Sequence, residues 1–240
     1  MKTRCLLLWL EGPLQSWGAD SKFGRRDTLW FPTKSGLLGM LCAAMGASGE
    51  QRELLEEMAD LDQTVISYIR LTRQKSGKTV QHDSEPLLQD FHMVGSGYDD
   101  TDPWQSMHIP KTMEGKKAVG GGQKMTYRYY LQDAKFAVIL KVPDSKAKIF
   151  ADALQNPVFD IYLGRKNCVP TDFVFRGIFD NEKDAIAAAG NIAAGKNLAE
   201  DFRVISGEDS KGESFTINDV PVQFGPVKKY RDRRVTRIQK

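Results

Sequence analysis

Lys34, Ser35 and Gly36 place a cation, a hydroxyl group and a position without a side chain at the expected start of a helix. Phe31–Pro32 precedes them and favours extended backbone, and Thr33 or Ser35 can cap the helix by accepting a hydrogen bond from a free N–H group. Because the free N–H groups and the dipole of a helix N-terminus attract anions, this stretch suits a phosphate group. The same residues also suit an ordinary capped and buried helix, and both interpretations stay open at this point.

Basic and aromatic residues lie close together in several other segments of the chain. Two arginines come just before the helix start, and tyrosines stand next to cations in the segment 124–130. Single-stranded RNA binds to this combination because unstacked bases pack on aromatic faces while Lys and Arg pair with phosphates. Each ring taken alone is more often a core residue. The RNA-binding candidates in these segments are Trp17, Lys22, Arg25, Arg26, Tyr127, Arg128 and Arg165.

A metal-independent ribonuclease needs a base that deprotonates a ribose 2′-hydroxyl and an acid that protonates the leaving oxygen. His108, Lys111 and Tyr127 offer such groups. Residues in an irregular segment meet this requirement by chance in many sequences, so the pattern alone does not favour catalysis. The chain also lacks the HExxH, paired-carboxylate and GxSxG signatures of hydrolases, and Gly164–Cys168 lacks the P-loop pattern. We therefore predict no catalytic residue.

The composition is that of a soluble globular protein. Of the 240 residues, 41% are apolar and 27% are charged, and no run of about 18 apolar residues occurs. Such a length fits one large domain or two small, closely packed domains. The cysteines Cys5, Cys42 and Cys168 are widely spaced and form no CxxC pair, so they indicate neither a disulfide framework nor a zinc site. We predict no metal, no cofactor, no membrane association and a cytoplasmic location.

The positive charge is concentrated at the C-terminal end of the chain. The whole chain has a net charge of +3, whereas residues 228–240 contain seven Lys or Arg residues and one Asp, and so carry +6. A basic tail on a slightly acidic body is expected to bind a polyanion or an acidic partner subunit. A solvated and frayed terminus is the alternative, and the composition does not separate the two.

The hydrophobic pattern predicts strands and helices interrupted by one long irregular segment. The order is strand, helix, strand, long excursion, strand, helix, strand, which leaves a βαββαβ arrangement if one short strand lies within the excursion. This is the ferredoxin-like plan. A further helix, short β segments and the basic tail follow. The expected elements are strands at 4–10, 63–73, 126–142 and 173–180, helices at about 33–46, 50–61, 145–155 and 182–196, and short β segments within 202–227.

Residues 74–125 form the long excursion, which is rich in Gly, Pro and Asp and shows no regular hydrophobic pattern. Irregular segments of this length inside a compact domain are unusual and are normally functional. Its second half is basic, so we interpret it as part of a protruding hairpin; a disordered insertion without a role is the alternative. Residues 136–140 lack the RNP1 pattern, so an RNA site on the usual sheet face is not expected.

Four segments have a more specific pattern. LEGPLQSWG at 10–18, RDTLWFPTKSGLLGMLCAAMG at 26–46, the stretch 130–140 and YLGRKNC at 162–168 resemble the CasD (Cas-five) family. That family belongs to the RAMP superfamily of CRISPR-associated proteins, and the resemblance is closest to its type I-E Cascade branch. The resemblance extends to about residue 180, and the remainder of the chain matches less clearly.

The resemblance implies an α+β fold with a ferredoxin-like (RAMP/RRM-like) core, a protruding β-hairpin thumb and an appended C-terminal β-rich region. The expected domain is 1–180 with the thumb insertion at about 74–128, followed by 181–240 with a helix, short strands and the basic tail. The resemblance also implies a non-catalytic subunit at the foot of Cascade, which holds the 5′ handle of the CRISPR RNA (crRNA) in antiviral defence. The expected partners are the crRNA, the large subunit that recognises the PAM, the backbone filament subunit and, indirectly, target DNA.

The resemblance also assigns residues. Trp17, Arg26 and the helix start at 34–36 fall on the family's motif positions near the handle, and the thumb would be the excursion. A type I-C relative cleaves pre-crRNA itself with a Tyr, Lys and His set, but this sequence lacks that branch's N-terminal pattern, and in type I-E another subunit cuts. We expect binding without cleavage, with a metal-independent endoribonuclease and a protein-only scaffold as the alternatives. The expected RNA-binding residues are Trp17, Lys22, Arg25, Arg26, Lys34, Ser35, Gly36, His108, Lys111, Tyr127, Arg128 and Arg165.

Overall fold

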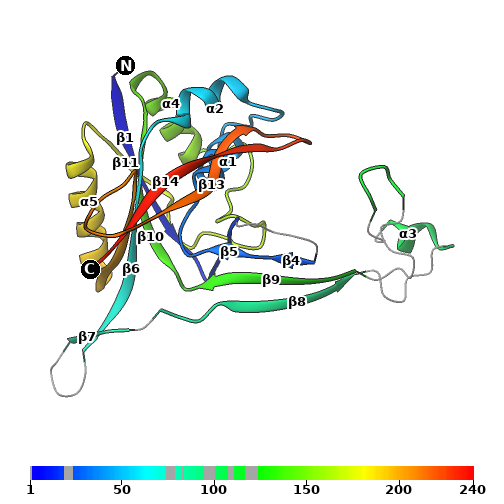
Figure 1. Ribbon diagram of the computed structural model, residues 1–240, viewed down its shortest axis with the longest axis horizontal. Coiled ribbons are helices and arrows are strands. Elements are labelled where there is room, and N and C mark those ends of the chain that lie inside the picture. Colours follow the sequence, from blue (N-terminus) through cyan, green and yellow to red (C-terminus); the bar gives the residue numbers. More distant parts are fainter. Residues whose placement is uncertain are drawn as a thin grey trace.

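A computed structural model describes residues 2–18, 24–73, 79–82, 84–94, 101–107, 111–116 and 124–240. Figure 1 shows a central sheet between helices, with one long hairpin that extends away from it. Within the described residues no helix is both long enough and apolar enough to span a membrane. The elements in chain order are β1 (Thr3–Glu11), β2 (Leu14–Gln15), β3 (Trp17–Gly18), β4 (Arg25–Arg26), β5 (Thr28–Leu29), α1 (Lys34–Ala44), α2 (Arg52–Ala59), β6 (Gln63–Arg73), β7 (Thr79–Gln81), β8 (Leu88–Val94), α3 (Pro103–Ser106), β9 (Lys124–Gln132), β10 (Lys135–Pro143), α4 (Asp144–Gln155), β11 (Phe175–Phe179), α5 (Glu182–Gly195), β12 (Leu198–Ser206), β13 (Glu213–Gln223) and β14 (Lys229–Gln239).

The central sheet has eight strands in the described part of the chain, and its main path runs in the order β11-β1-β10-β6-β12-β14-β13. Every pair of neighbours along this path is antiparallel. β1 and β10 pair over their full lengths, from Thr3 opposite Pro143 to Glu11 opposite Lys135. β1 is therefore a central strand, as its nearly continuous apolar run predicts.

Helices cover both faces of this sheet, and the side chains of β1 alternate between them. Leu6 and Leu8 pack into the core that contains the apolar residues of α1 and α4. Leu7 and Trp9 pack into the second core, against alanines of α5 such as Ala189. Figure 1 shows α5 on one side of the sheet and α1, α2 and α4 on the other. Because the small alanine side chains let α5 approach the sheet closely, both faces of β1 are buried.

Leaving out α2, the excursion and the short strands, the elements β1, α1, β6, β10, α4 and β11 occur in βαββαβ order, and their four strands lie side by side as β11-β1-β10-β6. The helices and strands expected between residues 4 and 73 and between 145 and 196 are confirmed to within a few residues. One expectation was wrong in detail: no strand from the excursion is needed to complete the order, because β6 and β10 already pair with each other.

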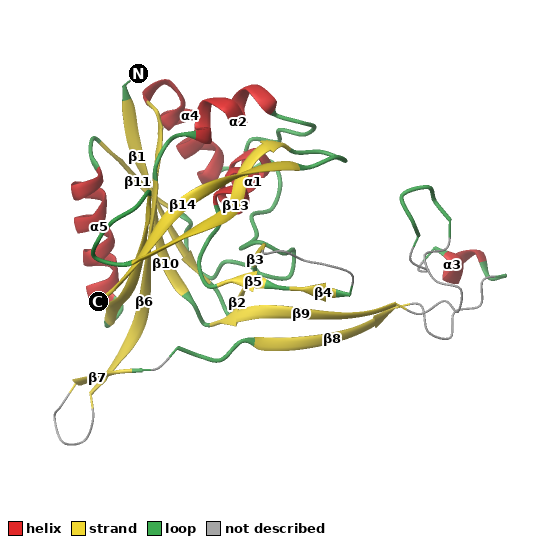
Figure 2. Cartoon of the chain, viewed as in Figure 1, coloured by secondary structure: helices red, strands yellow, loops and turns green. Residues whose placement is uncertain are grey.

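The stretch 126–142, expected as one strand, forms two. β9 ends at Gln132 and β10 begins at Lys135, with a turn at Asp133 (φ 47°). Aspartate tolerates this left-handed conformation better than most residues, and the backbone N–H of Asp133 donates to Pro13 O at 3.0 Å. β10 joins the central sheet, whereas β9 turns away and pairs with β8. Figure 2 shows this β8–β9 hairpin, which extends outward beside β4 and β5.

The C-terminal region is β-rich, as expected, but the expectation that its strands are short and end in a basic tail was wrong. β12, β13 and β14 have 9, 11 and 11 residues, and they extend the central sheet beyond β6. β14 lies between β12 and β13, and it buries Val235 completely. The basic residues of the tail are therefore side chains of a well-paired strand. Pro221 is tolerated in β13 because that strand lies at the edge of the sheet.

Candidate functional site

An open groove with a volume of about 650 Å³ runs along α1. The part of α1 that lines the groove consists mostly of small residues, Ser35, Gly36, Gly39, Cys42 and Ala43, together with the larger Met40. A Cβ atom at Gly39 would meet only the ring of Phe224, at 4.0 Å, so space remains above the helix there. The groove walls come from residues 16–18 and 26–27, the loop at 47–51 after α1, residues 159–165, and residues 224–230. The floor is thus largely backbone and small side chains, a surface on which a flat ligand can lie closely.

Trp17 supports this floor from inside the protein. Its side chain is fully buried, and its Nε1–H donates to Gln15 Oε1 at 3.1 Å. Gly36 packs directly on the indole, because a Cβ atom at this position would lie 2.9 Å from a ring carbon. The expectation that Trp17 stacks on an RNA base was therefore wrong, because its ring is already covered by α1. Because Gly36 has no side chain, α1 can pack closely against the Trp17 ring.

Lys34 is buried, with only 2% of its surface exposed. Its ammonium donates to Ala59 O at 2.7 Å and to Leu61 O at 2.6 Å, at the C-terminal end of α2 where carbonyl groups lack helical partners. Burial lowers the pKa of Lys34 to about 8, and the nearby positive charge of Arg233 adds to this shift. The expectation that this side chain binds a phosphate was wrong, because the ammonium points into the protein.

The N-terminus of α1 is capped by groups of the protein. Thr33 Oγ1 accepts a hydrogen bond from Gly36 N at 3.2 Å, as one of the two expected capping residues. Asp219 of β13 supplies the negative charge, because its Oδ2 accepts from Lys34 N at 2.7 Å. Arg233 holds this carboxylate with two hydrogen bonds of 2.6 and 2.9 Å. The interpretation as an ordinary capped helix is therefore correct, and Asp219 stands where a phosphate was expected.

Arg165 joins three segments beside the groove. Its guanidinium donates to Arg26 O at 2.7 Å and to Tyr129 O at 3.3 Å, and it lies over the ring of Tyr130 at 4.8 Å. Gly164 brings this loop against the backbone at Ser16, since a Cβ atom there would lie 1.7 Å from Ser16 O. Arg165 lines the groove, and its two hydrogen bonds hold the arm at 25–26 to β9.

Arg25 and Arg26 lie on β4, whose short parallel pairing with β9 places them opposite Tyr127 and Arg128. Arg25 is exposed, makes an ion pair with Asp27 at 2.9 Å, and lies over the ring of Tyr129 at 4.7 Å. The hydrogen bond to Asp27 raises the pKa of Arg25. Arg26 is half-buried and lines the groove. It stays a prediction that these two arginines contact RNA. The same holds for Ser35 and Gly36, which are half-buried.

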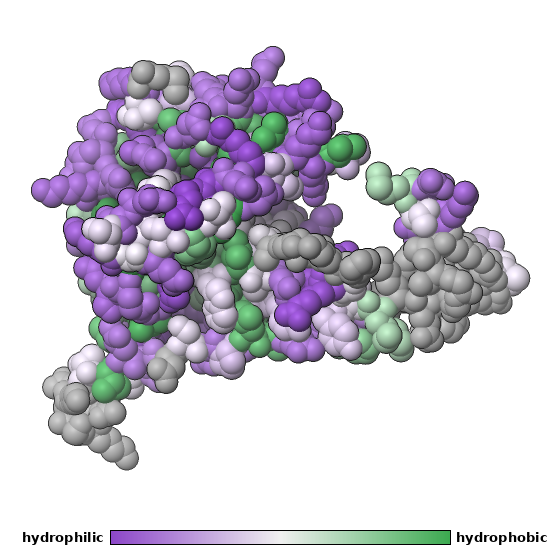
Figure 3. All heavy atoms as spheres, in the orientation of Figure 1, coloured by the Kyte–Doolittle hydropathy of each residue, from purple (hydrophilic) through white to green (hydrophobic). Residues whose placement is uncertain are grey.

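The β8–β9 hairpin has an exposed aromatic and apolar face. Tyr127 is 42% exposed, and its ring lies 5.3 Å from that of Phe91, which is 51% exposed. Met93 and Met125 are opposite each other further along the same face and are also exposed. Figure 3 shows apolar surface toward the outer part of this hairpin, among largely hydrophilic surroundings. Tyr127 is therefore accessible to a base, whereas Arg128 is half-buried on the other face.

The remaining expected residues lie outside this arrangement. Lys22 and His108 are outside the described residues, so the hypothesis of a His108, Lys111 and Tyr127 set has no geometry to test it. Lys111 is described and exposed. Sequence reasoning missed Lys228 and Tyr230 in the groove wall. The high charge of the segment 228–240 was the signal that could have located them, but it was assigned to a tail and not to a strand.

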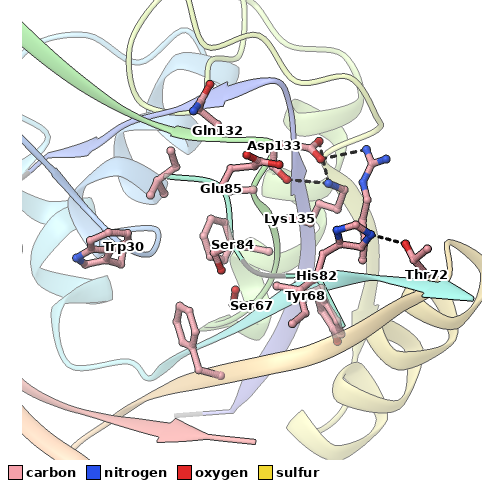
Figure 4. A pocket seen from close by; sticks show the side chains of 16 residues that line it. Trp30, Ser67, Tyr68, Thr72, His82, Ser84, Glu85, Gln132, Asp133 and Lys135 are labelled. Atoms are coloured by element: carbon pink, nitrogen blue, oxygen red, sulfur yellow. Dashed lines mark hydrogen bonds and ion pairs between the residues drawn. The ribbon is translucent and has the colours of Figure 1, made fainter. Parts of the chain in front are cut away.

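A second pocket of about 340 Å³ lies at the base of the hairpin, between β6, β10 and the residues His82, Ser84 and Glu85 (Figure 4). Its two cations, Lys135 and Arg70, are held by Asp133. Lys135 Nζ donates to Asp133 O at 2.7 Å and lies 2.9 Å from Asp133 Oδ1, and Arg70 forms an ion pair with Asp133 at 3.0 Å. His82 makes a hydrogen bond to Thr72. This pocket therefore offers less free charge to an anionic ligand than the groove does.

Comparisons with known proteins agree with one another. The family model described as "CRISPR-associated protein (Cas_Cas5)" matches residues 5–236. The protein "CRISPR system Cascade subunit CasD" of Escherichia coli (strain K12) is 29% identical over 175 residues, which are 72% of this chain and 70% of that protein. A chain of a solved "CRISPR RNA-guided surveillance complex" is 26% identical with a TM-score of 0.70, over 98% of this chain and 90% of that chain. A "Crystal structure of Cas protein" shares the fold, with 23% identity and a TM-score of 0.52, over 98% of this chain and 94% of that chain.

Proposed function

Because the family model covers residues 5–236, the chain belongs to the CRISPR-associated Cas5 family, and we propose that it is a Cascade subunit that binds the 5′ handle of a crRNA without cutting it. In this role it joins the large subunit to the backbone filament in antiviral defence. The similarity to a Cascade subunit of Escherichia coli (strain K12) and to a chain of an RNA-guided surveillance complex supports this assignment.

One observation favours the groove as the RNA site. Three segments whose residues resemble the CasD family, at 10–18, 26–46 and 162–168, meet at this single groove although they are far apart in the sequence. A surface that binds one fixed RNA sequence needs cations for the phosphates and surfaces for splayed bases. Arg26 supplies a cation there, and the small residues of α1 leave space for a base.

The exposed face of the β8–β9 hairpin supports the same proposal. Its base is tied to the groove, because Tyr127 N donates to Gly24 O at 2.8 Å and Arg165 bonds to Tyr129 O. A strand of RNA leaving the groove would meet Tyr127 and Phe91, whose rings are exposed. We propose that this hairpin is the thumb and that Arg25, Arg128 and Lys111 contact RNA on or near it.

The sheet topology supports a ferredoxin-like (RAMP/RRM-like) core. Its four strands lie in the order β11-β1-β10-β6, with α1 and α4 packed on one face, which is the arrangement expected of a βαββαβ unit. We propose that residues 1–180 form this functional core and that residues 181–240 extend it. The two parts share one sheet, because β12 pairs with β6. A cytoplasmic location, and contact with target DNA only through the large subunit, belong to the same proposal.

Co-purification tests this function. We would tag the full chain, express it with the other subunits of its operon, purify the assembly and sequence any RNA in it. The expected result is a set of guide RNAs that share one repeat-derived 5′ end. Assembly without RNA would instead indicate a protein-only scaffold. If the pure chain cut repeat RNA in EDTA, the protein would be a metal-independent endoribonuclease, and the non-catalytic role would be wrong.

A further inference from the structure

We propose that the tip of the β13–β14 hairpin, residues 224–230, forms a nucleotide subsite in which Lys228 binds a phosphate and the ring of Tyr230 packs against a base. This inference rests on the proposed function, because it identifies further contacts for the same RNA. It assigns a role to the C-terminal part of the chain, where the resemblance to the CasD family is least clear.

The tip lies at the groove and not at a free end of the molecule. Phe224, Gly225, Lys228 and Tyr230 all line the groove together with the small residues of α1. The ring of Phe224 comes within 4.0 Å of the position that a Cβ atom would take at Gly39. The hairpin tip is therefore one wall of the groove, and a ligand that lies on α1 also meets this wall.

The tip is held in place by hydrogen bonds to the loop between α1 and α2. Phe224 N donates to Glu50 O at 3.0 Å, and Gln223 Nε2 donates to Glu50 Oε1 at 3.1 Å. The same amide of Gln223 also donates to Val227 O at 2.9 Å, which closes the turn. Gln223 is only 5% exposed, so its side chain is fixed inside the tip. A wall fixed in this way loses little conformational entropy when a ligand binds.

The charge of Lys228 is available to a ligand. Within the described part of the chain, no carboxylate lies within ion-pair distance of this exposed lysine. The arginines that follow it differ, because Arg233 is paired with Asp219 and Arg234 with Glu208. Arg231 likewise pairs with Asp60. Lys228 can thus provide the phosphate contact that Lys34, whose ammonium is buried against the end of α2, cannot provide.

Tyr230 offers an aromatic surface in the same groove. It is 38% exposed, so part of its ring can be covered by a ligand. A single-stranded nucleotide presents both of the required groups, a phosphate for the lysine and an unstacked base for the ring. A purely acidic peptide would use the lysine but would gain little from the ring, and therefore RNA is the ligand that the pair of residues favours.

The experiment measures binding of a fluorescently labelled guide RNA with its repeat-derived 5′ end to the assembly of the full chain with its operon partners. The variants are Lys228→Ala, Tyr230→Ala, Lys228→Arg and Tyr230→Phe. Lys229→Ala is the matched control, because this neighbouring exposed lysine does not line the groove. Tyr230→Ala is expected to weaken binding about tenfold, because stacking is lost. Lys228→Ala is expected to reduce the salt dependence by about 0.7 in log–log slope, as for one lost phosphate contact.

Lys228→Arg keeps the charge and Tyr230→Phe keeps the ring. These two variants, and the control Lys229→Ala, are expected to bind like the wild type. If the wild-type assembly binds the RNA but Lys228→Ala and Tyr230→Ala match it in affinity and salt slope, the subsite is refuted while the proposed function stands. If the wild-type assembly retains no RNA, the proposed function fails and the subsite fails with it. Thermal unfolding of each variant establishes that a loss of binding is not a loss of folding.

Discussion

Lys34 holds its charge inside the protein because α2 ends beside it. Two carbonyl oxygens at that end, on Ala59 and Leu61, accept hydrogen bonds from the ammonium. A cation near the C-terminus of a helix is favourable, but burial still costs solvation of the charge. The cost of burial exceeds this gain, so the pKa of Lys34 is lowered to about 8. At the residue scale, Lys34 is therefore a structural residue that fixes α1 to α2.

This lowered pKa predicts a pH dependence of stability. In the unfolded chain Lys34 returns to its ordinary pKa of 10.5, so between the two values the unfolded state binds a proton that the folded state does not. The free energy of unfolding contributed by Lys34 therefore rises with pH across this window. We expect the unfolding free energy of the wild type to rise relative to that of Lys34→Met from about pH 7 to about pH 10. Denaturant titrations at both pH values measure it.

Lys148→Met is the control, because the Lys148 side chain is 82% exposed. Its difference from the wild type should stay nearly constant over the same range. A constant difference for Lys34→Met as well would contradict the lowered pKa.

Asp219 is the second residue on which the start of α1 depends. Its carboxylate caps Lys34 N and pairs with Arg233, and the two side chains are only 3% and 12% exposed. Removing one partner of a buried pair leaves the other charge uncompensated. We expect Asp219→Ala to destabilise the protein by about 3–5 kcal/mol, measured by chemical denaturation.

The comparison for Asp219→Ala is Glu208→Ala, which breaks the exposed pair with Arg234. That pair should contribute less than about 1 kcal/mol. Equal effects of the two substitutions would show that Asp219 has no special role at the helix start.

At the scale of elements, the loop at 162–168 connects the groove to the hairpin. Gly164 has φ 99° and touches the backbone of Ser16, while Arg165 holds both β4 and β9. The loop therefore sets where the hairpin base stands relative to α1. The motif YLGRKNC singled out this loop by its resemblance to the CasD family, but the pattern alone did not show that its arginine bonds to the backbone at Arg26 and Tyr129.

We expect Gly164→Ala to destabilise the protein more than Gly207→Ala. Both glycines have positive φ, but at Gly207 a Cβ atom would meet nothing within 4 Å, so only the backbone strain of about 1–2 kcal/mol applies there. At Gly164 the new methyl group must also displace the Ser16 carbonyl. Thermal unfolding compares the two variants, and equal melting temperatures would contradict the close packing of this loop.

The elements that could be predicted were those with local signals. β1, α1 and α4 have clear apolar patterns, and Thr33 gives a capping signal, so they were found. The division between β9 and β10 was missed because apolar and aromatic residues continue across it and Gln132-Asp133 is an inconspicuous turn. The cap from Asp219 could not be predicted either, since it lies 185 residues from Lys34 in the sequence.

At the scale of the whole molecule, the C-terminal strands complete the sheet. β14 pairs with both β12 and β13. Its Arg231, Arg233 and Arg234 are paired with acidic residues, whereas Arg237 lies over the ring of Phe202 at 4.4 Å. The high positive charge of residues 228–240 hid a strand, because few of its positions, such as Val235 and Thr236, are buried. The resemblance to a family could identify the class of protein and the N-terminal part of the groove, but not the wall that the C-terminal strands add.

This arrangement predicts the effect of truncation. A chain that ends at Val227 loses β14, leaves β12 and β13 without their shared partner, and removes Arg233 from Asp219. We expect it to be insoluble or unfolded by circular dichroism. A chain that ends at Ile238 keeps nearly all of the strand and is expected to fold. Cooperative unfolding of the shorter chain, like that of the full chain, would instead support a solvated tail.

The central claim is that the groove along α1 and the face of the β8–β9 hairpin bind one end of a guide RNA. Its most direct test is photo-crosslinking of the assembled complex with 4-thiouridine placed in the repeat-derived 5′ end, followed by mass spectrometry of the crosslinked peptides. If the groove and the hairpin bind this RNA end, crosslinks are expected in this chain within residues 26–43, 124–131 and 159–165. If the same nucleotides crosslinked only to other subunits, the groove would not be the RNA site.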